Sequence, residues 1–404
     1  MSTTQRRLPV TVVTGFLGAG KTTLLRQLLQ QSGQRLAVVV NEFGEVGIDG
    51  ALLRSCGFCP EAELDSRLIE LANGCLCCTV QDDFLPTMER LLLRADQLDG
   101  IVVETSGLAL PQPLVAAFGW PQIRSRTRVH AVVTVVDGEA LAAGAVVANP
   151  EALEAQRQAD PSLDHYEAID DLFDDQLSSA DLVLISRADL LPSNELERVE
   201  TRLRGRCRAG IPVLPMAQGH IDPDLLLGCV DDESPAQTGS RHQHNDVRDH
   251  HAQDHAHSHD HHQHDHDDVD HGNDHADDRD HVVGHDHDGA HDHSHVPIES
   301  VAMTLRGRWS QAQLETGLRH LIAEHGLIRA KGWLAMAGKQ RLLQVQAVGP
   351  RLQCWYEGQR NPETADDGPG ELQLVLLGFQ LDRNRLEQQL TAMAEPPVAA
   401  AKVN

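Results

Sequence analysis

Residues 15–22 carry the stretch Gly-Phe-Leu-Gly-Ala-Gly-Lys-Thr, which fits the phosphate-binding pattern Gly-x-x-x-x-Gly-Lys-Ser/Thr. The stretch stands between a β-branched run at 8–14, typical of a buried strand, and a helical pattern at 22–31. In this arrangement, backbone N–H groups and the positive end of a helix hold phosphate groups. A chance match is expected in about one of a hundred chains of this length. Because the flanking context also fits, the stretch predicts a P-loop nucleotide hydrolase.

Each fixed position of the loop has a chemical role. Lys21 reaches the β- and γ-phosphate oxygens and is predicted to be catalytic, while Thr22 offers its hydroxyl oxygen to Mg²⁺. The glycines let backbone N–H groups turn toward the phosphates. The predicted nucleotide contacts of the loop are Gly15, Gly18, Ala19, Gly20, Lys21 and Thr22.

Apolar runs alternate with helical patterns as far as about residue 230. Such alternation predicts an α/β fold with a mostly parallel sheet that is covered on both faces. The expected strands are 8–14, 35–41, 101–104, 130–137, 181–186 and 211–214, and the expected helices are 22–31, 82–95 and 193–203.

Two of these expected strands end on an acidic residue. Glu104 ends the run at 101–104, where a P-loop fold holds its Mg²⁺ shell, and Gly107 three residues later is placed to offer a backbone N–H to the γ-phosphate. The alternative is an ordinary exit from a strand into a loop. Asp137 ends the run at 130–137, with a helix N-cap or a turn as the alternative interpretation.

Length and composition limit the possible functions. The 404 residues suggest two or three domains, and 41% of them are hydrophobic. A net charge of −26 argues against a nucleic-acid partner, since phosphate backbones require a basic surface. We see neither a signal peptide nor a run of 18 apolar residues, so we expect no membrane span and a cytoplasmic protein.

A histidine- and aspartate-rich tract interrupts the chain. Nineteen of the 24 histidines lie between Ser234 and Val296, and residues 241–296 hold 15 Asp, no Glu and 3 Arg. The tract has too few apolar residues for their burial to offset the conformational entropy lost on folding. We therefore expect a disordered linker. Its role as a spacer, a metal reservoir or a pH-sensitive region stays open.

Apolar patterning returns at Pro297. Strands are expected at 300–305, 328–337, 341–347 and 371–379, and helices at 310–325 and 382–392, which together predict a small α+β domain. The predicted domains are therefore a P-loop GTPase domain at 1–232, the linker at 233–296 and a C-terminal domain at 297–395.

Five of the eight cysteines lie within residues 56–78. Cys75, Cys77 and Cys78 place three thiols in four positions, and such soft ligands suit Zn²⁺, Cu⁺ or Co²⁺. Burial as small hydrophobic residues is the alternative. Cys56 and Cys59 form a separate Cys-x-x-Cys pair that is ambiguous between metal and redox use.

Several stretches taken together resemble one known family. They are GFLGAGKTTLL (15–25), NEFGEVGID (41–49), ELANGCLCCTVQDDFLPTM (70–88), ETSG (104–107) and the histidine tract. In these stretches the chain resembles the CobW family of metal-handling P-loop GTPases, and most of all its cobalamin-biosynthesis members. The likeness is strong over residues 8–230 and weaker over 297–392. It implies GTP hydrolysis, metal binding at a Cys-x-Cys-Cys motif and delivery of the metal to a client protein.

The same resemblance assigns roles to individual residues. It makes Cys75, Cys77 and Cys78 the metal motif. It places Glu42 and Glu45 in the first switch region, Glu42 as a catalytic residue and Glu45 as a further metal ligand. Thr22 and Thr23 match the phosphate and Mg²⁺ positions of the family. Glu104 and Gly107 match its second nucleotide-sensing strand and are expected to be catalytic.

The base-recognition motif departs from the family pattern Asn-Lys-x-Asp. Here the residues are Ser186, Arg187, Ala188 and Asp189. Asp189 retains the carboxylate that accepts hydrogen bonds from guanine, and we expect Arg187 to stack over the base through its planar guanidinium. We therefore expect a preference for GTP that is relaxed by the loss of the asparagine.

The resemblance makes Co²⁺ the expected cargo and a cobaltochelatase one candidate client. The Irving–Williams order instead favours Zn²⁺ at a thiolate site, so a zinc metallochaperone is the alternative. A small-molecule kinase would leave the thiols without a role, and a passive metal store would rely on the histidine tract. The client, the fourth metal ligand and the oligomeric state stay open.

Overall fold

The structure is a computed structural model that describes residues 7–41, 68–71, 84–159, 169–227, 298–336, 338–357 and 370–394. Several predictions fall outside these ranges and remain predictions. They concern the linker at 233–296 and the residues Glu42, Glu45, Cys56, Cys59, Cys75, Cys77 and Cys78.

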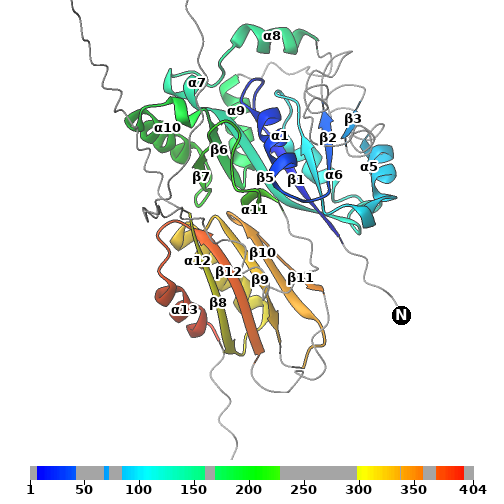
Figure 1. Cartoon of the computed structure of the whole chain (residues 1–404), viewed down its shortest axis with the longest axis vertical. Coiled ribbons are helices and arrows are strands. Elements are labelled where there is room, and N and C mark those ends of the chain that lie inside the picture. The colour runs from blue at the N-terminus through cyan, green and yellow to red at the C-terminus, as the bar shows by residue number, and fades with distance from the viewer. Residues whose placement is uncertain are drawn as a thin grey trace, which may run out of the picture. The chain divides into compact units, whose positions relative to one another are not determined.

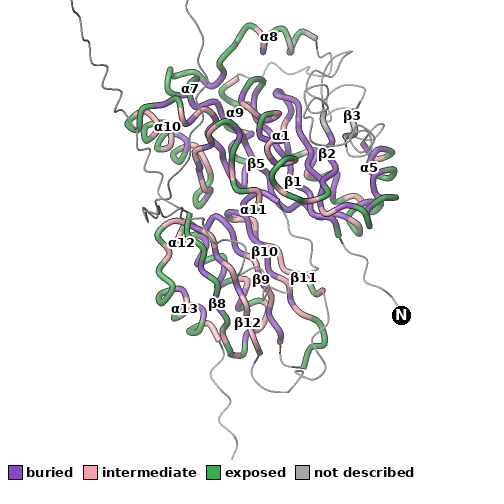
Figure 2. The backbone as a smooth tube through the Cα atoms, viewed as in Figure 1, coloured by how far each residue is buried: buried purple, intermediate pink, exposed green. Residues whose placement is uncertain are grey.

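A seven-stranded parallel sheet forms the first part of the chain (Figure 1). Its strand order is β3-β2-β4-β1-β5-β6-β7. All seven residues of β1 are buried, as expected for a parallel sheet covered on both faces (Figure 2). The predicted α/β fold class is confirmed. The strands are β1 Leu8–Thr14, β2 Leu36–Asn41, β3 Leu68–Leu71, β4 Gly100–Glu104, β5 Thr127–Asp137, β6 Leu182–Ser186 and β7 Val213–Pro215.

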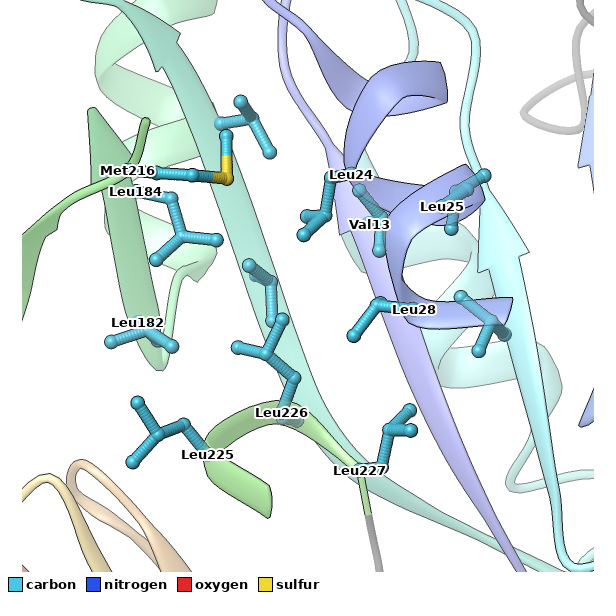
Figure 3. Packing of buried hydrophobic residues seen from close by; sticks show 14 of the residues in the cluster. Val13, Leu24, Leu25, Leu28, Leu182, Leu184, Met216, Leu225, Leu226 and Leu227 are labelled. Atoms are coloured by element: carbon cyan, nitrogen blue, oxygen red, sulfur yellow. The ribbon is translucent and has the colours of Figure 1, made fainter. Parts of the chain in front are cut away.

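Helices cover both faces because successive strand residues point to opposite sides. Val13 packs with Leu24 and Leu28 of α1, on the face that also carries α11 (Figure 3). Val12 belongs to the cluster on the other face, where Met88 of α5 lies. The helices are α1 Lys21–Gln31, α5 Leu85–Leu92, α6 Pro111–Ala117, α7 Gly138–Ala142, α8 Pro150–Ala159, α9 Ile169–Ser179, α10 Ser193–Arg206 and α11 Pro223–Leu226.

The strand order places a ligand site at one edge of this sheet. From β1 the chain first builds β2, β3 and β4 on one side, and then β5, β6 and β7 on the other. Ligands of such open sheets bind at the carboxyl ends of the strands, where the order reverses. The residues at these ends are Thr14, Glu104, Asp137 and Ser186, which belong to β1, β4, β5 and β6.

A five-stranded antiparallel sheet with two helices forms the C-terminal part, and its order is β11-β10-β9-β12-β8. Leu318 of α12 and Leu386 of α13 pack with alternate residues of the strands in one core. Ser310 and Gln313 form a capping box that begins α12, and Gly326 ends the helix with a φ of 59°. The predicted α+β class is confirmed. The elements are β8 Glu299–Gly307, α12 Gln311–His325, β9 Arg329–Ala335, β10 Leu342–Val348, β11 Arg351–Glu357, β12 Gly370–Gly378 and α13 Arg383–Ala392.

Some elements differ from the predicted ones. Strand β5 begins at Thr127, and the helix expected at 82–95 is α5 followed by a short 3-10 turn at Ala95–Gln97. Strands β3 and β11 were not predicted. The charged Glu70 interrupts the short apolar run of β3, and β11 carries Trp355 on the same face as Arg351, Gln353 and Glu357. Among the described residues, no helix is long and apolar enough to cross a membrane.

Candidate functional site

The loop between β1 and α1 has the backbone that its glycines predict. Gly15, Gly18 and Gly20 have φ values of 138°, 78° and 101°, a region that side chains disfavour. A Cβ atom on Gly15 would lie 2.1 Å from the carbonyl oxygen of Val135 on β5. Ala19 is buried, and its N–H donates to the carbonyl of Phe16 at 3.1 Å. The loop is therefore tightly wrapped and held against the centre of the sheet.

Lys21, Thr22 and Glu104 come together at the start of α1. The Lys21 Nζ atom donates to the carbonyl of Phe16 at 3.1 Å and lies 3.9 Å from Glu104 Oε1. The Thr22 hydroxyl donates to the same Glu104 oxygen at 3.4 Å. Glu104 is only 2% exposed, because β4 lies directly beside β1. This cluster of a cation, a hydroxyl and a carboxylate fits the predicted Mg²⁺-phosphate site, and those roles stay predictions.

The loop after β4 passes against the phosphate loop. The Thr105 hydroxyl donates to the Thr14 hydroxyl at 2.9 Å, and the Thr105 N–H donates to the carbonyl of Val13 at 2.9 Å. A Cβ atom on Gly107 would lie 2.6 Å from the backbone nitrogen of Leu17. A residue with a side chain would therefore force Gly107 away from the phosphate loop.

Arg187, in the loop after β6 that is predicted to recognise the base, contacts the phosphate loop. Its backbone has a φ of 54°, and its guanidinium donates to the carbonyl of Gly18 at 3.0 Å. The same side chain forms an ion pair with Asp137 and lies 3.7 Å from Glu139. The hydrogen bond with Asp137 raises the pKa of Arg187, so the guanidinium is firmly charged. The predicted stacking of Arg187 over a base remains a prediction.

Asp137 is the N-cap of α7, as one of its alternative interpretations predicted. Its Oδ1 atom accepts from the N–H groups of Glu139 and Ala140 at 3.1 and 3.3 Å. Its second oxygen is left for Arg187. Asp137 thereby anchors Arg187 to the end of β5.

Asp189 holds a buried oxygen atom that has no hydrogen-bond partner among the described residues. The residue lies in the 3-10 turn Ala188–Leu190 after β6, and its Oδ1 atom has no hydrogen bond within the described part of the chain. A buried acceptor without a donor costs about 1–3 kcal/mol. The N–H groups of guanine would supply the missing donors, so the carboxylate fits the predicted base. Ser186, in place of the family asparagine, instead donates to the carbonyl of Val136 at 3.1 Å.

Sequence reasoning missed the loop that follows β7. Met216 donates its N–H to Ile185 at 2.8 Å and accepts the N–H of Ala188 at 3.4 Å, so the loop borders the base-recognition turn. A Cβ atom on Gly219 would lie 2.9 Å from the carbonyl oxygen of Thr23, which places the loop beside α1 as well. The sequence did hold one signal for this position, because the loop follows the carboxyl end of the strand expected at 211–214, and ligands of such sheets bind at the carboxyl ends of the strands.

The predicted transition-metal ligands lie outside the described residues. Within the described ranges, no group of three or more His, Cys, Asp or Glu residues could hold a metal ion. Cys207 and Cys354 are free and half-buried, and burial raises their thiol pKa values to about 11 and about 12. These two thiols therefore stay protonated near neutral pH and are poor metal ligands.

Two family models match the chain. The model described as "CobW/HypB/UreG, nucleotide-binding domain" matches residues 9–215, and "Cobalamin synthesis protein cobW C-terminal domain" matches residues 298–394. The chain belongs to the CobW/HypB/UreG family. The resemblance drawn from the sequence is therefore confirmed.

Curated relatives match nearly the whole chain or about half of it. The chain is 42% identical to "Zinc chaperone CobW" of Pseudomonas aeruginosa, with 97% of this chain and 93% of the relative covered. It is 39% identical to "Zinc chaperone CobW" of Sinorhizobium sp, with 96% and 98% covered. It is 33% identical to "Zinc-regulated GTPase metalloprotein activator 1" of Schizosaccharomyces pombe, with 53% and 47% covered. The predictions of a GTP hydrolase and of a metallochaperone are confirmed by this family membership.

Proposed function

We propose that this GTPase is a zinc metallochaperone that holds its cargo at Cys75, Cys77 and Cys78, with Glu45 as a further ligand. GTP binding would close the site, and hydrolysis would release the metal to a client protein. Co²⁺ was the expected cargo, but the full-length relatives are named zinc chaperones, and thiolates bind Zn²⁺ more tightly than Co²⁺.

One observation carries this proposal. The carboxyl ends of β2 and β3 lie at the same edge of the parallel sheet as Glu104 and the phosphate loop. The segment with Glu45 leaves the sheet at Asn41, and the segment with the three cysteines leaves it at Leu71. Loss of the γ-phosphate would therefore occur at the same sheet edge from which both proposed metal-binding segments start. An ordering of such segments by GTP is the usual switch of P-loop GTPases.

The nucleotide part of the proposal rests on the described groups. Lys21 and the loop N–H groups would hold the phosphates, and Thr22 with Glu104 would hold Mg²⁺. Asp189 would select guanine through its unpaired oxygen. Mg²⁺, the client and a cytoplasmic location are parts of the proposal.

A metal competition tests the coupling. Zn²⁺ and Co²⁺ affinities would be measured on the full chain with Mg-GTP and with Mg-GDP. We expect tighter Zn²⁺ binding with Mg-GTP and a large loss in Cys77→Ala. Cys354→Ala is the matched control, since that thiol has a raised pKa and should leave the affinity unchanged. Equal Zn²⁺ affinity in both nucleotide states would refute the coupling, because a ligand that does not discriminate states shifts nothing.

Two further measurements separate the rival functions. Phosphate release without an acceptor molecule would argue against a small-molecule kinase. A chain that lacks residues 241–296 should keep most of its metal delivery if the cysteines hold the cargo. A passive store based on the histidine tract predicts the opposite order of effects, with the deletion more harmful than Cys77→Ala.

A further inference from the structure

Gln176 is a fully buried amide that contacts the loop after β4. It lies on α9, and its Nε2 atom is 3.2 Å from the carbonyl oxygen of Gly107 and 3.5 Å from that of Ala109. Its side chain is 0% exposed. The nucleotide chemistry described above makes no use of this residue.

The position of Gln176 is fixed from the sheet. The Thr134 hydroxyl on β5 donates to the backbone carbonyl of Gln176 at 3.2 Å. One turn earlier on α9, the ring of Phe173 stacks on Phe16 of the phosphate loop, with centroids 6.0 Å apart and an interplanar angle of 15°. Helix α9 therefore touches both the phosphate loop and the loop after β4.

Stability alone does not explain an amide at this place. The Gln176 Oε1 atom is buried and has no hydrogen-bond partner among the described residues. An unpaired buried acceptor carries a free-energy cost that an apolar side chain of similar volume would avoid. An apolar side chain at this position could not donate hydrogen bonds to the carbonyls of Gly107 and Ala109, as Gln176 does.

A hydrogen bond to Gly107 matters because glycine does not fix its own backbone. Without a Cβ atom, φ and ψ of Gly107 are weakly restricted, so a bond to its carbonyl does not by itself fix its N–H, which lies in the preceding peptide plane. That plane is held from Ala109, whose N–H donates to the Ser106 carbonyl at 3.1 Å. Leu17 packs against one side of Gly107, since a Cβ atom on Gly107 would lie 2.6 Å from the backbone nitrogen of Leu17. Gln176 donates to the carbonyls of both Gly107 and Ala109, so it holds the turn at 106–109 that carries the Gly107 N–H.

We propose that Gln176 is a positioning residue for GTP hydrolysis, which holds the turn at 106–109 so that the Gly107 N–H faces the γ-phosphate. This rests on the proposed function of this GTPase and on the role predicted for Gly107 from the sequence, in which its N–H contacts that phosphate. GDP has no γ-phosphate, so the contribution of Gln176 belongs to hydrolysis and leaves GDP binding unchanged.

The test compares kcat for GTP hydrolysis with the Kd for GDP on the full chain in Mg²⁺. Gln176→Met removes both donors and keeps an unbranched chain of similar length. We expect kcat to fall about tenfold, as for the loss of one hydrogen bond, with the Kd for GDP within about twofold of wild type. Ser178→Ala is the control on the same helix, because its hydroxyl bonds only to Asp175 within α9. A wild-type kcat, or equal losses in kcat and GDP affinity, would overturn the proposal.

Two more variants keep the test decisive. Gln176→Leu also lacks the donors, so its kcat decides the matter if Gln176→Met does not fold. Gly107→Ala tests the underlying role, because the added Cβ meets Leu17 and should lower kcat more than Gln176→Met does. A low kcat in Gly107→Ala beside a normal kcat in Gln176→Met would overturn only the role of Gln176. A normal kcat in Gly107→Ala would overturn both proposals.

Discussion

Asp189→Asn is the change that most directly tests how this protein selects its nucleotide. The substitution keeps the size of the side chain and replaces one acceptor oxygen with an N–H₂ donor. In the structure, the Oδ1 atom of Asp189 is buried and lacks a partner within the described residues, so it is ready to accept a hydrogen bond. Guanine offers two donors on one edge, the N1–H and the exocyclic amine, and a carboxylate accepts both.

The expected loss follows from these two hydrogen bonds. Each bond to a charged acceptor contributes about 1.5–3 kcal/mol. Asparagine keeps one acceptor but turns its donor toward the guanine amine, so we expect at least one bond to be lost and a donor–donor contact to be added. A total of about 3 kcal/mol corresponds to about a hundredfold weaker binding of GTP. Xanthosine triphosphate has an oxygen where guanine has the amine, so its affinity should rise in Asp189→Asn.

Equilibrium binding of GTP, ATP and xanthosine triphosphate in Mg²⁺ provides the assay. ATP should bind wild type and Asp189→Asn alike, because adenine presents a different pattern of donors and acceptors. Asp224→Asn is the control, since Asp224 is exposed at the start of α11, away from the base-recognition turn. Equal losses for GTP and ATP, or an unchanged GTP affinity, would refute the assignment of Asp189 as the base-selecting residue.

Three other changes test separate parts of the structure. Gly15→Ala places a Cβ 2.1 Å from the Val135 carbonyl, so we expect GTP and ATP affinities to fall together, by about tenfold or more; unchanged binding of both would contradict the packing described for this loop. Glu104→Gln should raise the Mg²⁺ concentration needed for half-maximal GTP hydrolysis, measured by phosphate release, while an unchanged Mg²⁺ dependence would exclude Glu104 from the ion's surroundings. His130→Phe tests a pH effect, because burial lowers the pKa of His130 well below its usual value of 6.5. The unfolded chain then binds a proton that the folded one does not, so wild-type stability should be highest above about pH 6.5 and fall by up to about 1.4 kcal/mol per pH unit below it. His130→Phe should flatten the fall of Tm between pH 7 and 5.5, and equal slopes would show that His130 is not its source.

The sequence predicted most of the architecture because the relevant signals are local. Apolar runs of four to eight residues between helical patterns were enough to place most strands of the parallel sheet. Strand β3 was not predicted because Glu70 interrupts its short apolar run, and β11 because its pattern does not alternate cleanly. Asp137 could not be assigned from the sequence, since a site residue and an N-cap look alike at the end of a strand.

The sequence by itself determined the phosphate loop. Its backbone needs positive φ values at Gly15, Gly18 and Gly20, and glycine at these positions can be read directly from the sequence. The tertiary structure alone decided which distant groups meet. Arg187 bonds to Gly18 across 169 positions, and Gln176 bonds to Gly107 across 69 positions. The reason is the order of the strands, which brings the ends of β1, β4, β5 and β6 to one edge. No local pattern encodes that order, so the contacts of Arg187 and Gln176 could be identified only from the tertiary structure.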